Sequence, residues 1–490
     1  MRPHPRVLLA TAGLAAVALT VAPTVGSAPS GGVDASATPA VRSHAVLESV
    51  SVRAGVPSDA TPEEIDITPA DCLSDYGYAC QTPDSVQSAY DIPDTIGGRP
   101  AGSGRTIVIV SPYGSPTIAS DLAAFDDDFG LPSTHLSVLS PGGPVDFDPT
   151  DQDELGWAGE TSLDVEWAHA VAPGADIDLV VAASDADDDL VRAEQYAIDH
   201  HLGDVLSLSF GEPEALIRGD SADQDQAHSA YLTARRLGMT VVAAAGDNGS
   251  DNGLGTPNPS FPASDPLVTA VGGTTLFAGT GVAGPRETTW GDLHGCPFGC
   301  AAGPFGATGG APSRLTGKAG TDVAYDADPY TGFVVQEGFY PDPSLDGTYF
   351  VGGTSAGAPQ WAGIVADLDQ AAGHDLGSLE GSLPAWAARG GLSDITVGDN
   401  ETPTYQRGYS AGRGDDVPTG YGTPDVATLL ELVSSRPTFG WTAFPSWWGD
   451  LTSAGNHLGL PSGWPGSYGG WFSGKGLGFG FGHSKGNGHH

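Results

Sequence analysis

The sequence is poor in basic residues. Its 490 residues contain 19 lysines and arginines against 60 aspartates and glutamates, so the formal net charge is -41 at pH 7 and the isoelectric point is near 4.2. Because such a surface repels polyanions, nucleic acids and anionic membranes are excluded as partners. Repulsion among carboxylates weakens as they protonate, which fits work at low pH. The alternative is that the negative charge only keeps an exported protein soluble.

Long apolar runs are missing after the N-terminus. In the first 28 residues, two arginines precede an apolar run that small residues close near Ala28, which is the pattern of a cleaved secretory signal peptide. An uncleaved anchor is the alternative, but the run is short for a membrane span. We therefore expect a secreted, extracellular protein with no membrane contact after signal cleavage.

Cysteine is also scarce, with four in the whole chain. An exported protein can keep disulfides, and the four residues form two pairs that are close in sequence. We expect the disulfides Cys72–Cys80 and Cys296–Cys300. Zinc is the alternative, but His294 is the only histidine near either pair, so zinc is disfavoured.

The middle of the chain alternates two kinds of pattern. Residues 29–80 are rich in Ala, Pro, Ser and Asp and predict a short, irregular leader, whereas residues 81–435 alternate apolar strand-like runs with helical patterns. This alternation predicts an α/β fold with a mostly parallel central sheet covered by helices on both faces. Sites in such sheets lie at the carboxyl ends of the strands. The expected strands are 105–114, 175–183, 203–211 and 239–249, and the expected helices include 162–172 and 225–238.

The last part of the chain, 436–490, has a different composition. It is rich in Gly, Ser and Trp and has neither a helical nor a long strand period. Such a composition predicts a flexible tail. Binding of a polymer surface by its tryptophans is the alternative.

A serine stands in a setting typical of a nucleophile. GGTSAGAPQWAGIVA, 352–366, places Ser355 between a glycine-rich turn and an apolar helical pattern. A serine hydroxyl needs an adjacent base to become nucleophilic. None of the thirteen histidines stands in an HG[TS] setting at a strand end, and His169 falls in mid-helix, where a core contact explains it.

Carboxylates are the better candidates for the base. Glu160 and Asp164 are four residues apart on a helical pattern, so their side chains share one face. Close carboxylates push each other's pKa values apart, so that one holds a proton while the other accepts one. A solvated acidic face is the alternative, weakened by the flanking Trp157 and Trp167. Asp247 ends an apolar strand in AAAGDNGS, where it is either a turn former or a site residue.

Together these residues resemble the sedolisins, the serine-carboxyl peptidases with a subtilisin-like fold, over roughly residues 85–430. The G-T-S-A-x-x-P motif would also occur in subtilisins, but the acid pair and the lack of a matching histidine motif separate the two. The matching positions are Gly353, Thr354, Ser355, Ala356 and Pro359, the pair Glu160 and Asp164 before Ala172–Ala175, and Asp247 in a G-D-x-G loop.

The resemblance implies a role for each catalytic position. Ser355 would attack the peptide carbonyl, and Glu160 would be the general base and then the acid. Asp164 would orient Glu160, and Asp247 would stabilise the oxyanion. A carboxyl group has a pKa near 4 against about 6.5 for histidine, so this chemistry favours acid pH.

The resemblance also implies one calcium site near the end of the domain. Two carboxylates and three main-chain carbonyls would supply the oxygen ligands that calcium prefers. An acidic loop with turn glycines is the alternative. The implied ligands are Asp394, Ile395, Gly412, Gly414 and Asp416.

Substrate binding is implied for the stretch 207–211, which resembles the strand that pairs with an extended peptide. An open edge there would place Ser207, Ser209 and Gly211 against the substrate.

The sequence thus predicts a secreted, acid-acting serine-carboxyl endopeptidase, a monomer acting on polypeptides, with a subtilisin-like three-layer α/β fold. It departs from the sedolisins in 29–80, where nothing resembles their large folded propeptide, so autocatalytic activation is not expected. Two other functions remain open. One is a Ser-His-Asp peptidase, and the other is a non-catalytic surface- or polymer-binding protein on a peptidase scaffold.

Overall fold

The computed structural model describes residues 46–47, 50–53, 68–76, 79–217, 222–281, 286–291, 306–402 and 405–434. The signal-peptide region, the tail from 436 and the predicted Cys296–Cys300 pair lie outside the described residues. None of the helices in the described part is long and apolar enough to cross a membrane.

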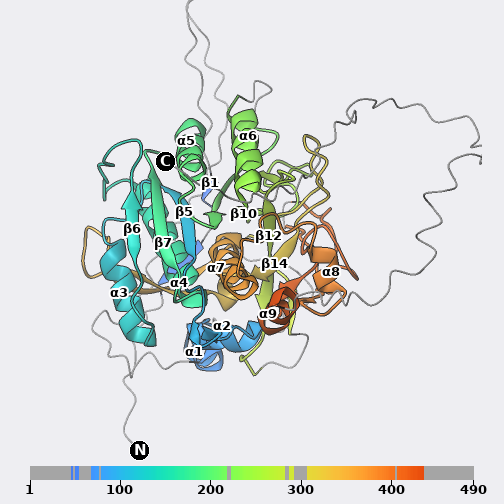
Figure 1. Ribbon diagram of the computed structural model, residues 1–490, viewed down its shortest axis with the longest axis horizontal. Helices are drawn as coiled ribbons and strands as arrows, with labels where there is room; N and C mark the ends of the chain where they lie inside the picture. Colours follow the sequence, from blue (N-terminus) through green and yellow to red (C-terminus); the bar gives the residue numbers. More distant parts are fainter. Residues whose placement is uncertain are drawn as a thin grey trace, which may run out of the picture. The chain divides into compact units, whose positions relative to one another are not determined.

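An eight-stranded, mostly parallel sheet forms the centre of the domain (Figure 1). Its order is β13-β12-β10-β8-β5-β7-β6, and β14 pairs with β12. Only the β12–β13 pair is antiparallel among these strands. The bounds are β5 Thr106–Pro112, β6 Leu136–Leu139, β7 Asp176–Ala182, β8 Val205–Leu208, β10 Thr240–Ala244, β12 Thr269–Leu276, β13 Glu287–Thr289 and β14 Val323–Asp326.

Alternating side chains of each central strand enter two different cores. Ile107 and Ile109 of β5 pack into one hydrophobic cluster, while Val108 and Val110 pack into the other. Successive side chains point to opposite faces of a strand, so both faces of the sheet are covered. The first cluster includes α2 Pro83–Tyr90, α3 Ile118–Phe129, α4 Gln152–Val171, α7 Thr354–Ala372 and α9 Val426–Ser434; the second includes α5 Asp187–Asp199 and α6 Ala222–Leu237.

Smaller sheets extend the fold. One joins β15 Phe333–Glu337, β16 Gly347–Gly352 and β2 Val50–Arg53 in the order β15-β16-β2. Another has the order β1-β9-β11, with β1 Val46–Leu47, β9 Phe210–Pro213 and β11 Ser260–Phe261. The remaining elements are β3 Thr95–Ile96 with β4 Arg99–Pro100, β17 Leu392–Ser393 with β18 Thr423–Pro424, α1 Pro69–Tyr76, α8 Leu383–Ala387 and a 3-10 turn at Pro329–Thr331.

Most predicted elements are present, with corrected bounds. The expected strand 203–211 is two strands, β8 and β9, and the expected helix at 162–172 begins already at Gln152. The segment 29–80, which was expected to be mostly irregular, contains β1, β2 and α1 among its described residues. The predicted disulfide Cys72–Cys80 is confirmed, with Cα atoms 5.7 Å apart.

Candidate active site

Ser355 lies in the first turn of α7, directly after β16. The turn between them needs Gly353, whose φ of 131° is accessible in practice to glycine only. Pro359 has no N–H, so it cannot give the carbonyl of Ser355 its helical hydrogen bond. The hydroxyl of Ser209 lies 3.4 Å from that carbonyl oxygen instead. The motif thus interrupts the helical hydrogen bonding at Ser355 and leaves its carbonyl to Ser209, which lies between β8 and β9.

The two predicted acids share one face of α4, as expected. Glu160 and Asp164 are buried, with 1% and 0% exposure, so the alternative of a solvated acidic face is wrong. Oδ1 of Asp164 accepts a 2.6 Å hydrogen bond from the hydroxyl of Ser209. Burial raises the pKa of Asp164 well above its ordinary value, the charge of Glu160 raises it further, and the bond from Ser209 opposes both. One proton is therefore readily held by this pair at acid pH.

Asp247 follows the end of β10 and faces the start of α7. Its Oδ1 accepts hydrogen bonds from the backbone N–H of Thr354 at 2.8 Å and from the Thr354 hydroxyl at 2.9 Å. The N–H of Gly246 in turn donates to that hydroxyl at 3.0 Å. Burial raises the pKa of Asp247 to about 8, although the bonds from Thr354 oppose the shift. Asp247 is therefore protonated below neutrality, and with Oδ1 used as an acceptor, the proton belongs on Oδ2.

Ser209 joins the acid pair to the serine. Its hydroxyl binds Asp164, and its carbonyl oxygen accepts from the hydroxyl of Ser355 at 3.4 Å. The structure thus brings together all four residues predicted to be catalytic, on α4, α7 and the loop after β10. Sequence reasoning gave Ser209 only a substrate contact and gave Thr354 no role of its own.

The open strand edge expected at Ser207 is not present. It lies in β8, where the backbone pairs with Ile109 of β5 on one side and Val242 of β10 on the other. No edge is left there for a peptide. Gly211 lies instead in β9, whose edges are taken by β1 and β11. At Ser209 the chain passes from the central sheet, which contains β8, to the β1-β9-β11 sheet. The residues on either side of Ser209 are similar in character, so the sequence does not reveal this passage.

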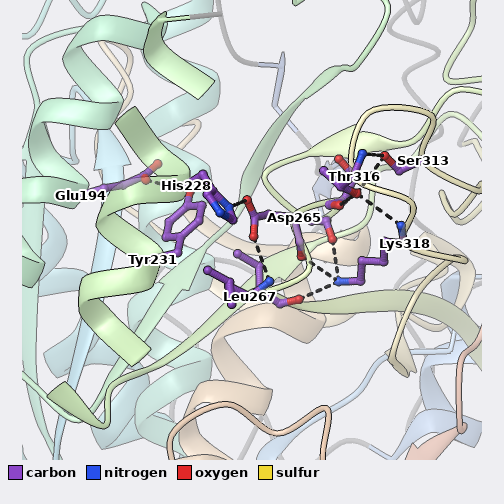
Figure 2. Close-up of polar contacts among 11 residues, drawn as sticks. Glu194, His228, Tyr231, Asp265, Leu267, Ser313, Thr316 and Lys318 are labelled. Atoms are coloured by element: carbon purple, nitrogen blue, oxygen red, sulfur yellow. Dashed lines mark hydrogen bonds and ion pairs between the residues drawn. The ribbon is translucent and has the colours of Figure 1, made fainter. Parts of the chain in front are cut away.

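Histidine supplies no base in the described part of the chain, where no histidine hydrogen-bonds to Ser355. His169 is fully buried, and its Nε2 lies 3.0 Å from Oδ1 of Asp126. Figure 2 shows His228 held by Asp265, with Nδ1 and Oδ2 2.7 Å apart. Both rings thus lie beside carboxylates outside the proposed site, Asp126 for His169 and Asp265 for His228.

The same close-up shows a lysine enclosed by backbone oxygens (Figure 2). Nζ of Lys318 donates to the carbonyls of Ala263 at 2.8 Å, Asp265 at 3.3 Å and Val268 at 2.6 Å, and it forms an ion pair with Asp322 at 2.7 Å. Its four partners fix the loop that follows β11 and join it to the segment leading into β14.

The predicted calcium ligands also lie together. The N–H of Gly414 donates to Asp394 at 3.1 and 3.0 Å, and the N–H of Gly412 donates to Asp416 at 2.7 Å. Burial raises the pKa of Asp416, bonds from Gly412 and Thr419 lower it, and the charge of Asp394 raises it again. Two close carboxylates thus share a loop of tight glycine turns.

The donor set fits a hard cation. Across the described ranges, no group of three or more His, Cys, Asp or Glu side chains is placed to hold a metal. Here, however, only two of the ligands would be carboxylates. The carbonyls of Ile395, Gly412 and Gly414 accept no hydrogen bond within the described residues, so their oxygens are available. Oxygen ligands of this kind are those that calcium prefers.

Comparison with known proteins first defines the class. Residues 156–382 match the Subtilase family model, so the chain contains a subtilase-type domain. It is 35% identical to kumamolisin of Bacillus sp. (strain MN-32) over 382 residues, covering 72% of this chain and 63% of kumamolisin. It is 29% identical to tripeptidyl-peptidase sed4 of Aspergillus fumigatus over 422 residues, covering 72% of this chain and 66% of that one.

A solved structure narrows the class further. Pseudomonas sedolisin, a serine-carboxyl proteinase, superposes with a TM-score of 0.62 and 26% identity over 73% of this chain and 99% of that one. The resemblance to the sedolisins and the subtilisin-like α/β fold are thereby confirmed. The chain spans a little under two thirds of the length of kumamolisin.

Proposed function

We propose that this protein is a secreted, acid-acting serine-carboxyl endopeptidase that hydrolyses polypeptides as a monomer. One observation carries the proposal. Ser209 binds Asp164 with its hydroxyl and meets the Ser355 hydroxyl with its carbonyl, which links a buried acid pair to a serine in a nucleophile turn. Peptidase relatives support it, and export is inferred from residues 1–28.

In the first half of the reaction, the Ser355 oxygen attacks the carbonyl carbon of the peptide bond. The carboxylate of Glu160 takes the serine proton, and Asp164 holds Glu160 in place. Negative charge develops on the carbonyl oxygen, where the N-terminus of α7 and the proton of Asp247 stabilise it. Glu160 then protonates the departing amine, and an acyl-enzyme remains.

In the second half, water replaces the amine. Glu160, again a carboxylate, accepts a proton from the water as it attacks the ester carbonyl. Asp247 stabilises the second oxyanion in the same way. Collapse of this intermediate returns the proton to the Ser355 oxygen and releases the new carboxyl terminus.

The chemistry explains why acid pH is expected. A carboxylate remains a base at pH values where histidine is fully protonated. Asp247 donates a hydrogen bond only while it keeps its proton, and its pKa of about 8 sets an upper limit to that role. Both requirements favour activity below neutrality.

We also propose one calcium ion at the loop after β17. Asp394 and Asp416 would supply carboxylate oxygens, and Ile395, Gly412 and Gly414 would supply carbonyl oxygens. When bound, the ion would neutralise the two carboxylates and fix the loop that leads into β18. No step of the hydrolysis depends on it.

Hydrolysis of an unfolded protein substrate between pH 2 and 9 tests the proposed function. Wild type is compared with Ser355→Ala, Glu160→Gln and the control Asp153→Asn, which alters an exposed acid of the same helix. We expect an acid optimum, losses of about a thousandfold or more in the first two variants, and no loss in the control. An optimum near pH 8, or full activity in Glu160→Gln, would contradict the mechanism. Mass spectra of the products that show only N-terminal tripeptides would exclude an endopeptidase.

A further inference from the structure

Asn400 is buried, with 0% exposure, between parts of the chain that are remote in sequence. The nitrogen of its amide donates at 3.1 Å to the carbonyl oxygen of Gly309 and at 2.8 Å to that of Gly310. Its Oδ1 accepts a hydrogen bond from the backbone N–H of Tyr409 at 2.8 Å. An amide has two N–H donors and one oxygen acceptor, so the side chain of Asn400 uses all of its hydrogen-bonding groups at once.

The backbone of Asn400 is bonded as well. Its N–H donates to the carbonyl of Tyr409 at 3.2 Å, and its carbonyl accepts from the N–H of Ser250 at 3.3 Å. The preceding residue, Asp399, forms an antiparallel bridge with Ser410. The amide of Asn400 is therefore presented from a paired stretch of backbone.

The segment 306–310, which Asn400 binds, lies directly against the loop that carries Asp247. The N–H of Ala307 donates to the carbonyl of Asp247 at 2.9 Å, and the N–H of Gly309 donates to the carbonyl of Gly246. Two successive peptide groups of the loop are thus bonded to this segment. The position of the Asp247 backbone depends on the position of the segment.

Glycines allow the two backbones to come so close. A Cβ atom on Gly309 would lie 1.9 Å from the carbonyl oxygen of Ala245, and one on Gly306 would lie 2.1 Å from the carbonyl oxygen of Asp247. No side chain of the segment therefore separates it from the loop at these two points. Because close-packed groups transmit displacement, a shift of the segment moves the loop as well.

Two side chains hold the segment in place. The hydroxyl of Thr308 accepts from the N–H of Gly273 in β12 at 2.6 Å, which ties the segment to the central sheet. Asn400 binds the two residues that follow. One of them is Gly309, whose N–H bonds to the carbonyl of Gly246. A single residue thus joins the amide of Asn400 to the loop that carries the oxyanion acid.

We propose that Asn400 is a positioning residue for Asp247. Its amide fixes the segment 306–310, and this segment fixes the backbone from which the carboxyl group of Asp247 donates to the oxyanion. The inference rests on the proposed function, in which Asp247 is that donor. Asn400 contacts neither the nucleophile nor the acid pair, so it acts only through the segment.

The first test is Asn400→Ala, with kcat and KM measured from pH 3 to 9 on a protein substrate. A donor that is no longer held in place stabilises the oxyanion less, so we expect kcat to fall about tenfold or more and KM to stay within about twofold. Burial is the main cause of the raised pKa of Asp247, and the charge of Glu160 adds to it. A loosened loop admits water and lowers this pKa, so the alkaline limb of kcat should move to lower pH by about one unit.

Thr240→Val is the matched control. Thr240 also has 0% exposure, and its hydroxyl donates to the carbonyl of Gly377 at 2.7 Å. It begins β10, the strand that leads to Asp247, and so lies at the opposite end of that strand. Loss of this bond should lower Tm, as in Asn400→Ala, but should leave kcat and its alkaline limb as in wild type.

Asn400→Asp separates the donors of the side chain from its shape. The new carboxyl group has the size of the amide, but it can donate to a carbonyl only while it is protonated. Burial among carbonyl oxygens raises its pKa, so it keeps its proton at pH 3. We expect kcat within about threefold of wild type at pH 3 and a further loss of about tenfold by pH 7. This variant also decides the question if Asn400→Ala does not fold, and a ratio to wild type that does not change with pH would contradict the proposal.

Amide hydrogen exchange locates the part that loosens. In Asn400→Ala, and in Asn400→Asp at pH 7, peptides that contain 246–249 and 306–310 should exchange faster than in wild type, while those from β5 should not change. Wild-type exchange in both segments, or a kcat and an alkaline limb that match those of Thr240→Val, overturns this inference and leaves the proposed peptidase standing. Wild type that is folded but hydrolyses no protein substrate between pH 2 and 9 overturns the proposed function, and this inference with it.

Discussion

The hydroxyl of Ser209 donates a 2.6 Å hydrogen bond to Oδ1 of Asp164. This bond stabilises the ionised form of a fully buried carboxyl group, whose pKa burial and Glu160 both raise. It is also the contact that ties α4 to the strand junction beside Ser355. The pKa of Asp164 therefore depends on Ser209, a residue that does not titrate itself.

Ser209→Ala should shift the pH profile rather than abolish activity. Loss of the hydrogen bond removes a stabilising contact from the carboxylate form of Asp164, so the pKa values of the acid pair rise. We expect the acid limb of kcat/KM to move upward by about 0.5 to 1 pH unit, with a drop of roughly tenfold at the optimum. Ser209→Thr, which keeps the hydroxyl, should restore the wild-type limb. An unmoved limb in Ser209→Ala would show that the bond does not tune the pair.

Asp247→Asn should be far more active than Asp247→Ala. The asparagine oxygen can accept the two bonds from Thr354, and its amide can donate to the oxyanion at any pH. Removal of one oxyanion donor costs about a hundredfold in kcat, which we expect for alanine and not for asparagine. We also expect the asparagine variant to lack the loss of activity that ionisation of Asp247 is proposed to cause around pH 8 in wild type. Equal inactivity of both variants, measured as kcat from pH 3 to 9, contradicts a donor role.

The site residues could be predicted because their signals are local. A spacing of four on a helix put Glu160 and Asp164 on one face, and the end of an apolar strand marked Asp247. The glycine turn before Ser355 was visible for the same reason. Each of these features depends on a few neighbouring residues, so it can be recognised in the sequence without knowledge of the tertiary structure.

The leader strands could not be predicted, because their partners are remote in sequence. Val46–Leu47 pairs with residues near 210, and Val50–Arg53 pairs with residues near 350. Strands of two and four residues leave no measurable period, and the composition of 29–80 hides them. The paired edges of the strand that contains Ser207 were missed for a related reason, since buried parallel strands lack the polar alternation that distinguishes an edge strand from a central one.

Calcium removal should lower stability and activity together. At the proposed site, chelation would leave Asp394 and Asp416 close and uncompensated, so the loop between β17 and β18 should loosen. At calcium concentrations about a hundred times the Kd, binding adds about 2.7 kcal/mol, which for a domain of this size corresponds to a loss of roughly 3 °C in Tm on chelation. Restored calcium should reverse the loss, and Asp416→Asn should show a smaller difference between the two conditions. The exposed Asp199→Asn is the control, and a Tm unaffected by chelation in wild type rejects the site.

Stability should be greatest at acid pH and should fall as the pH rises. Burial raises the pKa of Glu194 from 4.5 to about 8 and that of Asp328 from 3.8 to about 6. A carboxyl group with a raised pKa binds its proton more tightly in the folded state, so its contribution is fully present below about pH 4. As the pH rises, each group loses its contribution between its ordinary pKa and its raised pKa, at about 1.4 kcal/mol per pH unit. The loss is therefore complete near pH 6 for Asp328 and near pH 8 for Glu194.

The variant Glu194→Gln isolates one of these groups. Tyr231 donates a 2.8 Å hydrogen bond to Glu194, and a glutamine oxygen can still accept it while carrying no proton to lose. We expect Tm, measured from pH 4 to 8 at constant ionic strength, to decline less steeply between pH 6 and 8 in Glu194→Gln than in wild type. Asp153→Asn, which alters an exposed acid, should keep the wild-type slope. A Tm that rises from pH 4 to 8 in wild type would mean that carboxylates stabilised in their charged form outweigh the buried acids.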